Sequence, residues 1–150
     1  MEKIYGAVGR CDGIQQVGRR SWEIFYGYGE DDGVGWNYRL TLEHKPTIDE
    51  VRQIILGQIN SNVQEEILSG LNWENKTVWL SAENQRNIVF AASVKAPITL
   101  KLGTDNDYVF HTFDGDELED FAVTVQAHIE HAIAKGRVVK SAIDWDLYLI

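Results

Sequence analysis

The sequence contains little cysteine, which could form disulfides, and little proline, which interrupts helices and strands. Its 150 residues include one cysteine, Cys11, and two prolines, Pro46 and Pro97. A lone cysteine cannot form an internal disulfide, and no histidine lies near Cys11 in the sequence to suggest a zinc or haem motif. A chain of this length can bury about 70% of its unfolded surface in one hydrophobic core. The sequence therefore predicts one domain, residues 1–150, in a reducing compartment.

Basic residues and long apolar runs are also scarce. Lys and Arg number 14 against 23 Asp and Glu, a formal net charge of −9. A nucleic-acid-binding protein needs basic side chains to neutralise phosphates, so we expect no nucleic-acid partner. No stretch approaches 18 consecutive apolar residues, and residues 1–6 lack the features of a signal peptide. We expect no membrane association, and a location inside the cell or in a particle assembled there.

Strand patterns occupy the first 45 residues. A short apolar run covers residues 4–8, and two longer runs cover 22–28 and 36–42. Turn residues fill 29–35 between the longer runs, which predicts an antiparallel hairpin. Because strand side chains alternate between faces, we expect Trp22, Ile24, Tyr26 and Tyr28 on one face of the first strand, and Trp36, Tyr38, Leu40 and Leu42 on one face of the second.

Helical patterns begin after Pro46. Thr47 and Glu50 form a capping box, and apolar residues then recur at steps of three or four as far as Ile67. Gly70 is expected to end this helix as its C′ residue. Gly57 lies within the helix, and a second capping box follows it at residues 61–64, so we expect a bend or restart near residues 60–62.

Hairpins and helices alternate through the rest of the chain. We expect a short hairpin around residues 74–76, a helix from the cap Ser81 to about Val94, strands at 98–102 and 108–113, and a third helix from the cap Asp114 to Gly136. The sequence thus predicts an α+β fold with short antiparallel β-hairpins alternating with three main helices. Its parts are a hairpin region (1–45), a core (47–136) and a tail (137–150).

Several patterns could carry chemistry, and structural roles explain each of them. His128 and His131 are neighbours on a helix, but they do not form the zincin motif. Carboxylates crowd residues 104–121, but their spacing is not that of an EF-hand, and turns and helix capping account for them. No local signature activates Cys11. We predict no catalytic residue, no metal and no cofactor; a hydrolase built on the carboxylates would require a deep pocket holding an acid of raised pKa.

Two groups of residues are candidates for an interaction surface. Aromatic rings crowd the first hairpin, where one face could stay exposed or pack on the long helix. Polar side chains crowd the start of the second helix, where amides could contact a partner or bond neighbouring loop backbone. Together the candidates are Trp22, Tyr26, Tyr28, Trp36, Tyr38, Asn84, Gln85 and Asn87. Other rings fall within helix and strand patterns and are expected to pack: Trp79, Phe90, Phe110, Phe113 and Phe121.

The order of packing and turn residues resembles a family of phage and prophage proteins. The resemblance rests on residues 67–73, 77–87, 98–102 and 109–112, and on Glu117, Leu118 and Phe121. The family resembled is a domain of unknown function from tail and tail-fibre regions, and it matches about residues 47–136. Residues 26–30 and 143–145 extend the likeness to a version from prophages of gut Bacteroides-type bacteria. Asn75 and Lys76 depart from the pattern, since family members usually have a glycine in that turn.

The resemblance implies a genomic context and transfers no functional residue. We therefore expect a non-enzymatic phage structural or tail-assembly component that contacts phage tail or other proteins. The alternative is a module that binds a small ligand or carbohydrate by stacking it on the hairpin aromatics. The sequence leaves the oligomeric state open.

Overall fold

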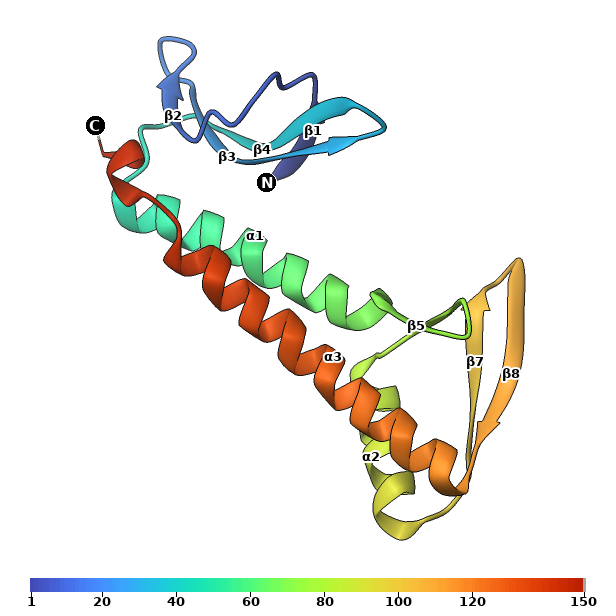
Figure 1. Ribbon diagram of the computed structural model, residues 1–150. Coiled ribbons are helices and arrows are strands. Elements are labelled where there is room, and N and C mark those ends of the chain that lie inside the picture. The colour runs from blue at the N-terminus through green and yellow to red at the C-terminus, as the bar shows by residue number, and fades with distance from the viewer. Residues whose placement is uncertain (150) are drawn as a thin grey trace. The chain divides into compact units, whose positions relative to one another are not determined.

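The computed structural model describes residues 1–149 and has an α+β architecture (Figure 1). The chain divides into two compact units, one formed by Met1–Ile59 with the segment from Lys140 onward, the other by Asn60–Val139. Both boundaries fall inside long helices. The organisation of residues 1–150 as one domain stays a prediction.

The first unit contains a four-stranded antiparallel sheet. Its strands are β1 (Glu2–Tyr5), β2 (Gly13–Gln16), β3 (Trp22–Asp31) and β4 (Val34–Leu42), in the order β1-β4-β3-β2. The β3–β4 hairpin was predicted, but its turn is only Asp32-Gly33, both with positive φ. The strand β2 was not predicted, because its polar Gly13–Gln16 segment lacks the alternation typical of a strand.

One face of this sheet packs on the first helix, α1 (Ile48–Ser69). The Thr47 hydroxyl accepts a hydrogen bond from the Glu50 amide at 3.2 Å, as a capping box requires. The Glu50 carboxylate does not follow the prediction, since it lies 2.8 Å from His44 Nε2. The core of the unit is formed by residues of β3, of α1 and of the short 3-10 helix η1 (Trp145–Tyr148). Its buried residues are Ile24, Tyr26, Val51, Ile55, Ile59 and Tyr148.

A bend or restart was expected near residues 60–62; the restart is wrong, because α1 is continuous from Ile48 to Ser69. Its apolar stripe keeps the helical period through this region, and packing of such a stripe outweighs the weak local signals of Gly57 and residues 61–64. Gly70 follows the helix as expected, but its φ is not positive. Its amide bonds the Glu66 carbonyl, against which a Cβ at this position would collide.

The second unit contains another antiparallel sheet, one whole helix and parts of two others. The strands are β5 (Leu71–Trp73), β6 (Lys76–Val78), β7 (Ile98–Thr104) and β8 (Asp107–Phe113), paired in chain order, and α2 (Ala82–Val94) lies between β6 and β7 in the chain. These elements confirm the predicted hairpins and helix. Phe113 stacks on Phe121 at 3.9 Å between ring centroids, and Trp73 meets both rings edge-on. Phe113 and Phe121 are fully buried in the unit's core, and the partly buried Trp73 packs against it.

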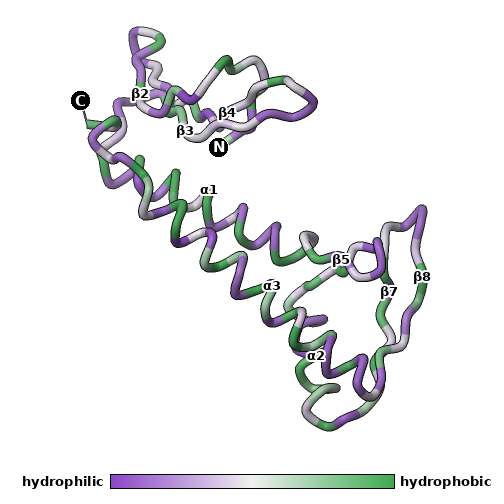
Figure 2. Tube along the Cα trace, in the orientation of Figure 1, coloured by the Kyte–Doolittle hydropathy of each residue, from purple (hydrophilic) through white to green (hydrophobic). Residues whose placement is uncertain are grey.

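The third helix, α3 (Gly115–Ser141), begins after Asp114 as predicted. It does not end at Gly136, which is a buried helical residue. A Cβ on Gly136 would stand 2.5 Å from Val63 Cγ2 of α1, so the glycine allows the two helices to approach closely. The predicted tail is therefore partly helical. Figure 2 shows hydrophobic and hydrophilic residues alternating along α1 and α3. Within residues 1–149, no helix has the length and continuous apolar character needed to cross a membrane.

Candidate functional site

The hairpin aromatics expected at a surface are largely involved in packing. Tyr26 is only 5% exposed and belongs to the core of the first unit, so the prediction that it contributes to a surface is wrong. Its ring stacks with that of Tyr38 at 6.4 Å, and Trp36 meets Tyr38 edge-on at 5.2 Å. Trp22, Trp36 and Tyr38 are half-buried. Helix α1 covers one face of the hairpin, which confirms the alternative that this face packs on the long helix.

A β-bulge separates Tyr28 from the other rings of its strand. The β3–β4 register passes from Tyr26 opposite Tyr38 to Gly29 opposite Trp36, so two residues of β3 oppose Asn37 alone. One extra residue reverses the alternation of faces beyond it. Tyr28 therefore lies on the opposite face from Tyr26, and its hydroxyl donates to Glu30 at 2.8 Å. The expectation that Trp22, Ile24, Tyr26 and Tyr28 share one face is wrong for Tyr28.

The polar start of α2 holds the preceding loop. Ser81 caps the helix by accepting from the Asn84 amide at 3.1 Å. The Asn84 side chain donates to the Trp79 carbonyl at 2.7 Å, and that of Gln85 donates to the Leu80 carbonyl at 2.8 Å. Asn84 and Gln85 thus have the backbone-bonding role that the sequence left open. Asn87 is exposed, and its role at a surface stays a prediction.

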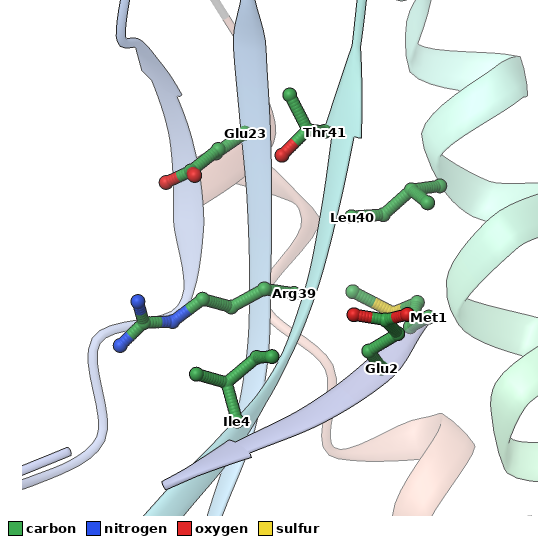
Figure 3. Close-up of a pocket in the computed structure, with 7 residues that line it drawn as sticks. All are labelled: Met1, Glu2, Ile4, Glu23, Arg39, Leu40 and Thr41. Carbon is green, nitrogen blue, oxygen red and sulfur yellow. The ribbon is translucent and has the colours of Figure 1, made fainter. Parts of the chain in front are cut away.

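The face of the first sheet turned away from α1 carries a polar network centred on Arg39. Figure 3 shows Arg39 and Glu23 extending from the strands on this side. Arg39 Nε donates to Asn37 Oδ1 at 2.9 Å, and Asn37 Nδ2 donates to Cys11 Sγ at 3.3 Å. The guanidinium carbon also lies 5.3 Å from the centroid of Phe25. Asn37 is fully buried, and the network satisfies its amide.

Arg39 lines two shallow hollows on this face. One, of about 430 Å³, is also lined by Met1, Glu2, Ile4, Glu23, Leu40 and Thr41 (Figure 3). The other, of about 330 Å³, lies between Arg39 and the segment Gly6–Cys11. A guanidinium suits planar anions such as carboxylate. Two carboxylates, from Glu2 and Glu23, line the larger hollow as well, so its charge is mixed and does not favour an anion.

A second polar cluster joins β1 to the end of β3. Asp31 accepts hydrogen bonds at 2.6 Å from both Lys3 Nζ and the Tyr5 hydroxyl. The hydrogen bond from Lys3, followed by that from Tyr5, lowers the pKa of Asp31, and the same contact with Asp31 raises the pKa of Lys3. Lys3 also lies 4.3 Å from the Trp36 ring. The cluster holds strand ends together at the protein surface.

The histidines and carboxylates considered as metal ligands form pairwise contacts. His111 Nε2 lies 2.6 Å from Glu117, and His128 Nε2 lies 2.8 Å from the Glu66 carbonyl. Lys101 and Lys76 pair with Asp105 and Asp107, each at 2.6 Å. Among residues 1–149, no group of three or more His, Cys, Asp or Glu side chains is placed to hold a metal ion.

Apolar side chains are exposed where the sequence predicted packing. Phe90 on α2 is 67% exposed and Phe110 on β8 is 68% exposed, while Trp79 is 40% exposed and donates through its indole to the Gly103 carbonyl. The expectation that these three rings are packed is wrong. Phe90 of α2 and Phe110 of β8 point away from the core. The core side of α2 is formed by Ile88 and Ala91, and that of β8 by Phe113.

Strand β8 carries three exposed apolar side chains in succession. Tyr108, Val109 and Phe110 are consecutive and are 47%, 46% and 68% exposed. Tyr108 and Phe110 meet edge-on at 5.7 Å. No sequence signal separated this strand from a buried one, because a short run of apolar residues such as Tyr108–Phe110 also occurs in buried strands. We call Asp107–Phe113 with these three exposed side chains the β8 edge.

In comparisons with known proteins, no protein-family model, no curated protein and no solved structure matches the chain.

Proposed function

We propose that this protein is a non-enzymatic assembly component that acts through protein–protein contacts made by the β8 edge. The observation that carries the proposal is the exposure of Tyr108, Val109 and Phe110 on the outermost strand of the second sheet. An outermost strand presents unpaired backbone N–H and C=O groups, and exposed apolar side chains add area that a partner can bury. Backbone and side chains at this edge thus both favour a protein partner.

The setting that we propose is the tail region of a phage or prophage. This part of the proposal rests on the order of packing and turn residues that resembles the tail-region family, including Val109-Phe110-His111-Thr112 of the β8 edge. The partners would be phage tail or other proteins. The location would be the bacterial cytoplasm during assembly, or the virion.

Binding of a carbohydrate by the hairpin aromatics is the weaker candidate. A stacking platform needs exposed ring faces. Tyr26 is buried, and Tyr28 lies on the opposite face of the sheet from Tyr26. The remaining rings are half-buried: Trp22, Trp36 and Tyr38. These placements leave the hairpin rings less exposed than Tyr108 and Phe110 of the β8 edge.

The proposal is tested by capture of partners from cells that produce the protein during prophage induction. The wild-type chain is compared with Phe110→Lys, which places a charge at the centre of the β8 edge. Phe90→Lys is the matched control, since Phe90 has almost the same exposure but lies on α2. We expect tail-region proteins to be retained by the wild type and by Phe90→Lys and lost with Phe110→Lys. Equal retention by all three would overturn the proposal.

A further inference from the structure

We infer that the β8 edge pairs with the β8 edge of a second copy of this chain, extending the sheet across a two-fold axis. The inference deepens the proposed function and rests on its assignment of the β8 edge as the contact surface. It names the partner and the register, which the proposed function does not.

The first step is the regularity of the strand. All seven residues of β8 pair with β7 in an unbroken antiparallel register, from Thr104 opposite Asp107 to Ile98 opposite Phe113. In such a ladder alternate residues direct their N–H and C=O groups toward the neighbour, and the others direct them away. The sheet order places no strand beyond β8 among the described residues. Its outward backbone groups are therefore aligned for another strand.

The second step is the absence from β8 of features that usually block an edge. Natural edges carry lysine, proline or a bulge that prevents pairing. The Asp107–Phe113 sequence contains no lysine, arginine or proline, and its register contains no bulge. By contrast, the first sheet has a bulge in β3 and a lysine in the edge strand β1. The β8 edge is thus open to pairing.

The third step is that apolar groups are exposed on both faces of the strand. Tyr108 and Phe110 lie on one face, and Val109 lies on the other, because side chains alternate. A helix lying on one face would cover the two rings and leave Val109 exposed. A strand that continues the sheet brings its own side chains to both faces. The occupant that fits this edge is therefore an extended strand.

The fourth step is local charge, which permits a second copy to approach. The whole chain carries −9, but the acidic groups at the tip of β8 are paired, Asp107 with Lys76 and Asp105 with Lys101. In an antiparallel pair centred on Phe110, the two Asp107 residues lie at opposite ends. Phe110 then opposes Phe110 of the second copy, Val109 opposes His111, and Tyr108 opposes Thr112. Within residues 107–113 no like charges face each other, and aromatic cross-strand pairs are favourable.

A single strand pair gives a small interface, so the dimer is expected to be weak and concentration-dependent. Sedimentation velocity of the purified full chain over a wide concentration range would show an increase toward the mass of a dimer. Phe110→Lys and Val109→Lys should abolish the increase, whereas Phe90→Lys should preserve it. Unfolding midpoints measure whether each variant stays folded, and the exposure of all three positions favours a folded chain.

The register is tested by cross-linking in a Cys11→Ser background, which removes the only cysteine. Val109→Cys and His111→Cys are made in separate chains, each of which keeps Tyr108 and Phe110. Mixed and mildly oxidised, they should form a disulfide-linked heterodimer, because opposed residues lie within disulfide reach, while each variant alone should cross-link far less. A third variant, Thr104→Cys, lies outside β8 and should not cross-link with either.

The two proposals can fail separately. A chain that stays monomeric at every concentration, or that dimerises equally well with Phe110→Lys, would overturn the self-pairing. If partner capture from cells were still lost with Phe110→Lys, the proposed function would stand with a different partner. If the purified chain dimerised through β8 in this register but captured no tail-region protein, the self-pairing would stand and the proposed function would fall.

Discussion

Gly136 of α3 lies so close to Val63 of α1 that a side chain at position 136 has no room. A Cβ there would stand 2.5 Å from Val63 Cγ2, and Gly136 itself is buried. Glycine inside a helix ordinarily costs about 1 kcal/mol relative to alanine. The close approach of two helices offsets that cost here, so the residue that was predicted to end the helix is a packing residue.

Gly136→Ala should therefore destabilise the protein in spite of the better helix propensity of alanine. We expect a loss of about 1–3 kcal/mol in the free energy of unfolding, because the methyl group would overpack the contact with Val63. The midpoint of urea denaturation, at constant slope, measures the change.

Gly57→Ala is the matched control, since Gly57 is also a helical glycine. It is exposed, and a Cβ there would meet nothing within 4 Å. Alanine should stabilise the protein by about 1 kcal/mol at this position. Shifts of the same sign in both variants would contradict the assigned role of Gly136.

Most of the elements could be predicted from the sequence because their signals are local. The Ser81 cap, the Asp114 helix start and the alternation in β7 are set by neighbouring residues, and the structure confirms each of them. Gly136 packs against Val63, which is distant from it in sequence, and no local pattern distinguishes such a packing glycine from one that ends a helix. The strand β2 is likewise held by its pairing with β3 and not by its own polar sequence.

The surface was harder to predict because alternation alone does not specify which face packs. A single bulge at Gly27-Tyr28 changed the face of Tyr28. The rings Phe90 and Phe110 lie in regular elements, as predicted, but on their outer sides. Periodicity gives the spacing of a stripe, whereas the elements that cover it are fixed by contacts between distant segments.

The amides at the start of α2 give a second prediction. Asn84→Ala and Gln85→Ala should each destabilise the protein by about 1 kcal/mol, because each removes a hydrogen bond to the carbonyl of Trp79 or Leu80. Thermal unfolding measures the change. Asn87→Ala, which alters an exposed residue of the same helix, should leave the midpoint nearly unchanged. An equal effect at all three positions would contradict the loop-holding role of Asn84 and Gln85.

The Asp31 cluster predicts an acid-dependent contribution to stability. Hydrogen bonds from Lys3 and Tyr5 place the pKa of Asp31 below its unfolded value, so the contribution is present above about pH 4 and is lost as the pH falls through the folded pKa. Asp31→Asn should lower the urea midpoint at pH 7 and have little effect at pH 2. Asp32→Asn, in the adjoining turn, is the control, because Lys3 and Tyr5 both donate to Asp31. A constant difference between wild type and Asp31→Asn at both pH values would contradict the assignment.

The buried Tyr148 predicts a contribution to folding stability that is lost as the pH rises into the alkaline range. Its ring is buried in the core of the first unit, and its hydroxyl donates to the Phe25 carbonyl at 2.7 Å. Burial, and secondarily the charge of Asp12, raises the pKa of Tyr148 far above its ordinary value. The folded protein therefore keeps this proton where the unfolded chain releases it. The stability that depends on the proton is complete below about pH 10 and is lost as the pH rises toward the folded pKa.

Tyr148→Phe should remove this part of the alkaline loss. At neutral pH the variant should be less stable by about 1 kcal/mol, because the hydrogen bond to the Phe25 carbonyl is lost. An ordinary tyrosine titrates between about pH 9 and about pH 11. Over this range the free energy of unfolding of Tyr148→Phe should fall less steeply than that of the wild type. Tyr108→Phe, which changes an exposed tyrosine, should preserve the wild-type slope. Equal slopes for Tyr148→Phe and the wild type would show that the Tyr148 hydroxyl is not buried in the folded protein, since the linkage requires a difference in pKa between the two states.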